Sequence, residues 1–359
     1  MYIGVLILQA DALKGRSYMK IKNISALILS ASLALTMSGC ALFGGGDDAP
    51  DETRPMNADE YESRISELES QVESLKAETV VQIGFRDKTD YILGKDNPAV
   101  SEAAALKEEA MADLPATITI KGTEYSTRLT SLTLNNMGLN DDDIKDLKYM
   151  VNLTELHMYQ NHVTDITPLK GLTSLKTLSL FNNDITDISP LAGLIGLETL
   201  YLRGNNISDI SALDGLHNVQ TLDISENNIK DITPLSELRN VKLLRINDND
   251  ISDISALSGL KSMDRLHMQN NSISDITPLT AMADLTEVYL ENNNVSDVEP
   301  LMSLTSLGWI KLGYNPVTNF TPITHLTQLK KLYIEGINLP EDELQSLQDK
   351  LPDTTLVTK

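Results

Sequence analysis

The sequence is poor in cysteine, aromatic residues and basic charge. Cys40 is the only cysteine among 359 residues, so no disulfide can form within the chain and packing must supply its stability. Aromatic residues make up 4% of the chain and hydrophobic residues 41%, which favours a core built from small, repeated aliphatic parts. The 29 basic and 51 acidic residues give a formal net charge of −22, which argues against nucleic acid as a partner because its binding needs a basic surface.

Familiar catalytic motifs are also missing. The sequence contains no G-x-S-x-G, no H-E-x-x-H and no phosphate-binding loop. No two histidines have metal-ligand spacing within one repeat; they are His157, His162, His217, His267 and His325. We therefore predict that the protein is not an enzyme and uses neither a cofactor nor a metal.

The N-terminal segment has the features of a signal peptide. A basic start at Met19–Lys22 precedes an apolar run over Ile24–Met37, which is short for a span of a bilayer about 30 Å thick. The following Met37-Ser-Gly-Cys40 resembles the lipobox of bacterial lipoproteins. The resemblance implies a signal peptide over residues 1–39, a fatty acyl group such as palmitate on Cys40, and a location on the outer side of a bacterial membrane. The alternatives are an ordinary cleaved signal with an incidental cysteine, and translation from Met19 without residues 1–18.

Three segments separate Cys40 from the body of the chain. Residues 40–60 are rich in glycine, proline and acids and are expected to form a flexible, acylated tether. Residues 61–79 carry apolar side chains at alternating spacings of four and three: Tyr61, Ile65, Leu68, Val72 and Leu75. They predict a short helix that either self-associates as a coiled coil or packs alone on the body. Residues 80–128 are interpreted as an N-terminal cap, with a helix over Ser101–Asp113 capped by Ser101 and a strand over Thr117–Ile120.

From residue 129 to 339 the chain consists of ten repeats. After a first unit that starts at Leu129, an apolar residue recurs every 22 positions: Leu153, Leu175, Leu197, Val219, Val241, Met263, Leu285, Leu307 and Leu329. Each unit begins with a short alternating strand pattern and then turns inward. Eight units carry an asparagine at that turn, which is expected to satisfy buried backbone groups: Asn161, Asn183, Asn205, Asn227, Asn249, Asn271, Asn293 and Asn315.

A repeated aspartate precedes a Ser-Pro or Thr-Pro turn in many units. We expect these carboxylates to cap the next turn, with binding of divalent cations as the alternative: Asp165, Asp187, Asp209, Asp231, Asp253, Asp275 and Asp297. Asp141, Asp142 and Asp143 follow Asn140 and are expected to form the acidic first turn of a helix.

Segments such as Asn271–Leu279, with the pattern N-x-I-x-D-I-T-P-L, resemble the leucine-rich repeat family, and within it the internalin-like 22-residue class of bacterial surface proteins. The resemblance implies an α/β solenoid: a right-handed horseshoe with a parallel sheet on its concave face, short 3-10 turns on its convex side and a helical stem at the N-terminus. Residues 340–359 are expected to form a helical C-terminal cap, with Leu344, Leu347 and Leu351 on one side.

The scarce aromatic residues gather at positions that face the concave side. Together with nearby basic residues they are the candidate partner-binding residues: His157, Tyr159, Phe181, Tyr201, Arg203, Arg245, His267, Tyr289, Trp309, Lys311, Tyr314 and Tyr333. The simpler explanation is that strands favour aromatic residues. The sequence thus predicts a surface protein that binds a protein partner. The alternatives are an envelope scaffold that oligomerises through residues 61–79, and a protein that binds carbohydrate or wall polymer.

Overall fold

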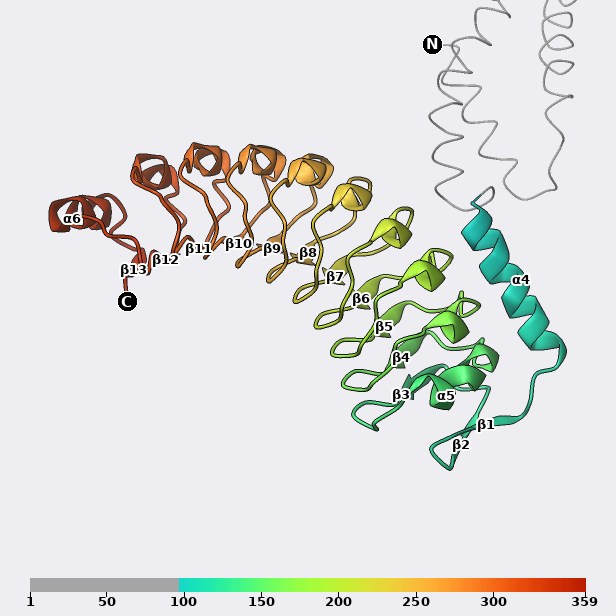
Figure 1. Ribbon diagram of the computed structural model, residues 1–359. Helices are drawn as coiled ribbons and strands as arrows, with labels where there is room; N and C mark the ends of the chain where they lie inside the picture. The colour runs from blue at the N-terminus through green and yellow to red at the C-terminus, as the bar shows by residue number, and fades with distance from the viewer. Residues whose placement is uncertain (1–96) are drawn as a thin grey trace, which may run out of the picture. The chain divides into compact units, whose positions relative to one another are not determined.

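The computed structural model describes residues 97–359, which form a curved array of repeats (Figure 1). The predicted signal peptide, Cys40, tether and helix 61–79, and residues 80–96 of the predicted cap, lie outside these residues. Eleven parallel strands form one sheet in sequential order, which confirms the predicted solenoid. They are β3 Ser131–Thr133, β4 Glu155–His157, β5 Thr177–Ser179, β6 Thr199–Tyr201, β7 Thr221–Asp223, β8 Leu243–Arg245, β9 Arg265–His267, β10 Glu287–Tyr289, β11 Trp309–Lys311, β12 Lys331–Tyr333 and β13 Thr355–Val357.

Short 3-10 helices form the convex side, as predicted. They are η2 Lys145–Tyr149, η3 Thr167–Leu169, η4 Ser189–Leu191, η5 Ser211–Leu213, η6 Thr233–Leu235, η7 Ser255–Gly259, η8 Thr277–Ala281, η9 Glu299–Ser303 and η10 Thr321–His325. Equivalent residues of neighbouring strands pair in register, so Leu178 lies beside Leu156 and Leu200. All three are fully buried, and the core is a continuous stack of such aliphatic side chains.

The asparagines of the inward turns join each repeat to the one before it. Asn183 Nδ2 donates to the carbonyl oxygens of Met158 and Leu180 at 2.9 and 3.0 Å. Its Oδ1 accepts from the amide of Val163 at 3.2 Å. Asn315 makes the same contacts with Leu290, Leu312 and Val295. Because these backbone groups lie away from water, each amide removes the cost of leaving several of them unpaired.

The repeated aspartates lie at the start of the 3-10 helices. Asp231 Oδ1 accepts from the amide of Thr233 at 2.8 Å, and Asp275 does the same with Thr277. The side-chain hydrogen bond from Thr233, followed by its backbone amide, lowers the pKa of Asp231. Among residues 97–359, no group of three His, Cys, Asp or Glu side chains is placed to hold a metal ion. These contacts are those of turn caps.

Helix α4 (Pro98–Ala112) precedes the repeats and corrects one detail of the prediction. Its N-cap is Asn97, whose Oδ1 accepts from the amide of Ala99 at 2.9 Å; Ser101 lies inside the helix. Asparagine followed by proline at the first helical position is a strong start signal, and it places the start before Ser101. None of the helices within residues 97–359 is both long and apolar enough to cross a membrane.

Helix α4 packs on the convex side of the first repeats (Figure 1). A Cβ atom added to Gly193 would lie 2.5 Å from the carbonyl oxygen of Ala99, so the two backbones approach closely. Lys170 pairs with Glu102 of α4 at 2.6 Å. Strand β1 (Thr117–Ile120) follows where a strand was predicted and pairs with β2 (Thr123–Ser126) in an antiparallel hairpin. Helix α5 (Asp141–Ile144) has the predicted acidic turn, capped by Asn140.

The C-terminal segment contains a strand as well as the expected helix. Helix α6 (Glu341–Lys350) buries Leu347 against the last repeat. After it, β13 pairs in parallel with β12 and becomes the last strand of the sheet. The prediction of a purely helical cap over residues 340–359 is therefore incomplete. A stretch of three strand residues after a helix is too short to show a periodicity of its own.

Candidate functional site

The concave face consists of the outward side chains of the parallel strands. In-register pairing places the third residue of each strand beside its equivalent in the next repeat, for example Tyr289 beside His267 and Lys311. Neighbouring strands lie about 4.8 Å apart, so these side chains contact one another across the repeats. The repeat register therefore decides which of the candidate residues meet.

Tyr159 and Phe181 meet face to face. Their ring centroids lie 4.2 Å apart and the ring planes differ by 11°. Both side chains are half-buried. Of the other candidates in this part of the face, His157 lies beside Ser179, and Tyr201 lies between Ser179 and Asp223. In this part of the face, Tyr159 and Phe181 are the candidate residues whose rings are in contact.

A longer column follows in strands β9 to β12. His267 stacks on Tyr289 with ring centroids 4.3 Å apart and planes 7° apart. Lys311 Nζ lies on the next repeat, 4.2 Å from the Tyr289 ring centroid and 5.1 Å from that of Tyr333. We call His267, Tyr289, Lys311 and Tyr333 the aromatic column. Each member covers its neighbour, so both faces of the Tyr289 ring are in contact with other side chains of the chain itself.

Two carboxylates stabilise the column. Glu287 Oε1 lies 3.0 Å from His267 Nε2, and Glu291 Oε1 lies 3.2 Å from Lys311 Nζ. Burial lowers the pKa of His267, partly offset by Glu287, and burial raises the pKa of Glu291. Burial, together with a hydrogen bond to Glu287, also raises the pKa of Tyr289. The aromatic column therefore contains stacked rings and two basic side chains, His267 and Lys311, each of which has a carboxylate beside it.

The two candidate arginines also have acidic neighbours. Arg203 Nη2 lies 2.6 Å from Glu226 Oε1, and Arg245 Nη1 lies 3.7 Å from Asp223 Oδ2. Sequence reasoning did not select the carboxylates Asp223, Glu226, Glu287 and Glu291. They lie about one repeat away from their partners along the chain, so a search for opposite charges at this spacing could have found them.

Trp309 and Tyr314 are candidate binding residues that are not members of the aromatic column. Trp309 is the first residue of β11, and Lys330 Nζ lies 5.0 Å from its ring centroid. Tyr314 is 60% exposed and has a left-handed φ of 57°. Its ring lies against Gly336, where an added Cβ would come within 2.4 Å of Cδ1. Within residues 97–359, neither ring stacks on another aromatic ring.

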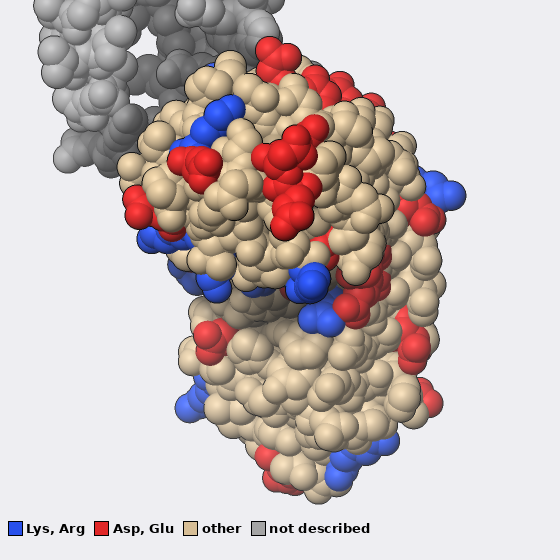
Figure 2. Space-filling view, turned by 90° about the vertical axis from the view of Figure 1, so that its left-hand side faces the viewer, with Lys and Arg blue, Asp and Glu red and all other residues tan. Residues whose placement is uncertain are grey.

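Figure 2 views the molecule from its C-terminal end. Basic side chains border the hollow that lies between this end and the earlier repeats, and acidic side chains gather on the end nearest the viewer. Acidic side chains also lie directly beside the basic ones at one edge of the hollow. The hollowed side is therefore not uniformly acidic, although the chain as a whole carries a net charge of −22.

Comparisons with known proteins agree with this geometry. A family model described as leucine-rich repeats in two copies matches residues 151–193, 195–237 and 239–281. The crystal structure of internalin C2 from Listeria monocytogenes is similar to this chain, with 32% sequence identity and a TM-score of 0.51. The match covers 62% of this chain and 95% of the internalin C2 chain. No curated protein matches the chain.

Two further solved structures share the fold. A leucine-rich repeat protein of Leptospira interrogans is 23% identical over 59% of this chain and 56% of its own, with a TM-score of 0.57. The functional domain of InlJ from Listeria monocytogenes is 20% identical over 72% of this chain and 58% of its own, with a TM-score of 0.50.

Proposed function

Because this chain belongs to the internalin-like leucine-rich repeat family, we propose that it is a bacterial surface protein that binds a protein partner on the concave face of its repeats. The binding residues proposed are those selected from the sequence, with the aromatic column and the Tyr159–Phe181 pair at their centre. In this proposal the protein has no catalytic role.

The aromatic column carries the proposal. Its rings and the Lys311 ammonium are held by one another, and Glu287 and Glu291 hold the two basic members. Side chains that are fixed before binding lose little conformational entropy when a partner docks. Tyrosine is also enriched among the residues that dominate the binding energy of protein interfaces. A surface of this kind suits a protein of complementary shape.

The same geometry favours a protein over a carbohydrate. A sugar that binds an aromatic side chain packs against an open ring face. Both faces of Tyr289 are covered, and Tyr159 and Phe181 each cover one face of the other. The Tyr289 ring therefore presents mainly its edge to a ligand, and one face each of Tyr159 and Phe181 is closed to it. Ring edges carry partial positive charge and suit the apolar groups and carbonyl oxygens of a protein surface.

The location of the protein is proposed from the sequence around Cys40. We propose that a lipid on Cys40 anchors the chain at the outer side of a bacterial membrane. Cys40→Ser should move the protein from the membrane fraction to the soluble fraction of fractionated cells. A Cys40→Ser protein that stays in the membrane fraction would contradict the lipid anchor.

The binding proposal can be tested by capture from envelope extracts with the chain from Ala41 onward as bait. Phe181→Ala and Tyr289→Ala should each reduce recovery of the partner at least about tenfold, because each removes an interface anchor worth about 2 kcal/mol. Lys261→Ala, an exposed residue after η7, is the matched control and should retain capture. Equal recovery by all four proteins, with unchanged thermal unfolding, would reject the concave face as the binding surface.

A further inference from the structure

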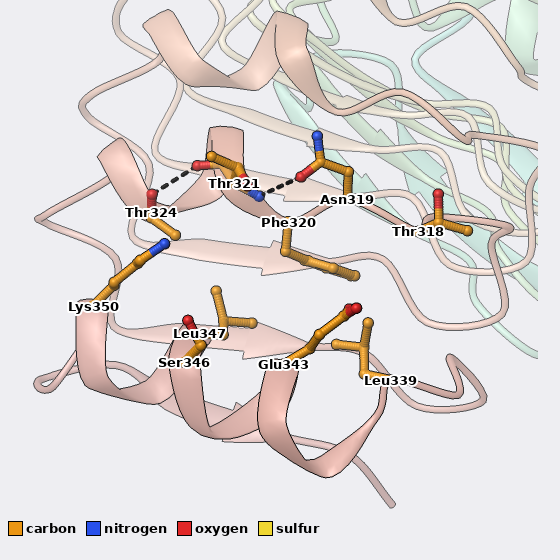
Figure 3. Close-up of a pocket in the computed structure, with 10 residues that line it drawn as sticks. All are labelled: Thr318, Asn319, Phe320, Thr321, Thr324, Leu339, Glu343, Ser346, Leu347 and Lys350. Atoms are coloured by element: carbon orange, nitrogen blue, oxygen red, sulfur yellow. Dashed lines mark hydrogen bonds between the residues drawn. The ribbon is translucent and has the colours of Figure 1, made fainter.

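A second candidate site lies at the C-terminal end of the array, beside the 3-10 helix η10 that connects β11 to β12 and away from the strands themselves. A cavity of about 220 Å³ opens between η10 and α6 (Figure 3). Five residues of the last repeats line one wall and five residues around α6 line the other. The cavity is smaller than the roughly 300–1,000 Å³ of sites for drug-sized molecules, so it suits a smaller ligand.

Two apolar side chains lie in the middle of the cavity, whose lining is otherwise mostly polar. Phe320 takes the place that isoleucine or valine occupies in the earlier repeats, such as Ile276 and Val298. Its ring projects between η10 and α6 (Figure 3), and 7% of its surface remains exposed. Leu347 of α6 lies opposite and is buried. An apolar body of a ligand would be in contact with both side chains.

Three polar side chains of α6 line the same cavity. Glu343, Ser346 and Lys350 are spaced by three and four residues, so they lie on one side of the helix. Figure 3 shows Glu343 near Leu339 and Phe320 at one end of the cavity and Lys350 near Thr324 at its other end. Within residues 97–359, none of the three side chains makes a hydrogen bond or an ion pair. Among the described residues, an exposed carboxylate and an exposed ammonium group therefore lie at opposite ends of the cavity, with the largely buried Phe320 and Leu347 between them.

The facing wall lacks one negative charge that the repeat pattern would place there. Asn319 stands where seven earlier repeats carry aspartate. It keeps the capping contact, since its Oδ1 accepts from the amide of Thr321 at 3.0 Å. The amide therefore preserves the turn while leaving Glu343 as the lining carboxylate of the cavity.

We propose that this cavity binds a small dipolar molecule of dipeptide size. Its ammonium group pairs with Glu343, its carboxylate pairs with Lys350, and its apolar body packs on Phe320 and Leu347. Seven residues along a helix correspond to about 10 Å. A ligand that pairs with both side chains at once must therefore carry its two charges several ångströms apart. A dipeptide spans at most about 7 Å, and a single amino acid spans about half of that.

The helix dipole explains part of this arrangement but not all of it. An acid in the first turn and a base in the last turn stabilise a helix on any of its sides. Glu341 and Asp342 satisfy the same preference without lining the cavity. The dipole alone therefore does not select the cavity side for Glu343 and Lys350.

The test is calorimetric titration of the full chain with L-alanyl-L-alanine. Saturable binding is expected, and it should fall at least about tenfold with either the N-acetylated or the C-amidated dipeptide, because each lacks one charge. Glu343→Gln and Lys350→Gln should weaken binding to the same extent, whereas Glu341→Gln should not. No saturable binding, or equal binding of the blocked dipeptides, overturns the proposal.

Exchanging the charges of Glu343 and Lys350 tests whether these two side chains bind the two ends of the ligand. The double variant Glu343→Lys/Lys350→Glu should recover binding, since the ligand can reverse its direction. If this variant fails to fold because its charges oppose the helix dipole, the blocked dipeptides on the unmodified protein still decide the question. Tyr289→Ala should leave dipeptide binding unchanged. The test of the cavity is therefore independent of the test of partner binding on the concave face.

Discussion

Lys311 lies between the rings of Tyr289 and Tyr333, with its ammonium nitrogen 4.2 and 5.1 Å from their centroids. The same nitrogen is 3.2 Å from Glu291 Oε1. A single side chain thus connects three successive repeats on the concave face. Removing the Lys311 side chain would disturb the stack and would leave the half-buried Glu291 carboxylate without its cation.

Lys311→Met should lower the free energy of unfolding by about 1–3 kcal/mol, because Glu291 keeps its burial and loses its cation. Urea unfolding at pH 7 measures the loss. The double variant Lys311→Met/Glu291→Gln should recover part of it, since no buried charge remains. Equal losses in the single and double variants would show that the ion pair does not stabilise the fold.

His267 should make stability depend on pH. Burial depresses its folded-state pKa below the ordinary value of 6.5, against the opposing effect of Glu287 and with Arg245 and Lys311 also facing it. A depressed pKa contributes stability that is present above pH 6.5 and is lost as pH falls through the folded-state value. The difference in unfolding free energy between the unmodified protein and His267→Gln should therefore shrink from pH 7.5 to pH 5.5. His325→Gln, at an exposed position, is the control, and a difference that does not change with pH would contradict the expectation.

The asparagines of the inward turns should be among the most sensitive polar positions. Asn205→Ala removes the partners of the Leu180 and Leu202 carbonyl oxygens and of the Ile185 amide. Leaving these buried groups unpaired should cost about 2–4 kcal/mol. Asn206→Ala changes the adjacent, exposed asparagine and should cost less than about 0.5 kcal/mol. Similar losses for the two variants in chemical unfolding would contradict a special role of the turn asparagines.

The packing of α4 can be tested with two glycines at equivalent positions of different repeats. A Cβ on Gly193 would come within 2.5 Å of the Ala99 carbonyl oxygen, whereas the nearest atom to a Cβ on Gly259 is 3.4 Å away. Gly193→Ala should therefore displace α4 and cost about 1–3 kcal/mol, and Gly259→Ala should be nearly neutral. Hydrogen exchange of α4 amides measures the displacement. Unchanged protection of α4 in Gly193→Ala would show that the helix does not depend on this contact.

Much of the repeat region was predictable because repetition turns spacing along the chain into contact in space. Residues 22 positions apart become neighbours, so the parallel sheet, the 3-10 turns, and the placement of Tyr159 beside Phe181 follow from alignment of the units. The segments around the repeats lack that relation. The start of α4 follows from the local Asn97-Pro98 capping signal. The contact of α4 with Gly193 and the final strand β13, in contrast, arise from packing between stretches of unlike sequence.

The amino-acid sequence by itself determined the family, the number and phase of the repeats, and the positions of the asparagine and aspartate side chains in each turn. These features depend on local periodicity, and every added unit repeats the same evidence. Only the tertiary structure decided which charges neutralise one another, which ring faces are covered, and where a cavity remains. Those outcomes depend on side-chain directions and on how α4 and α6 pack against particular repeats, and neither is encoded in the period.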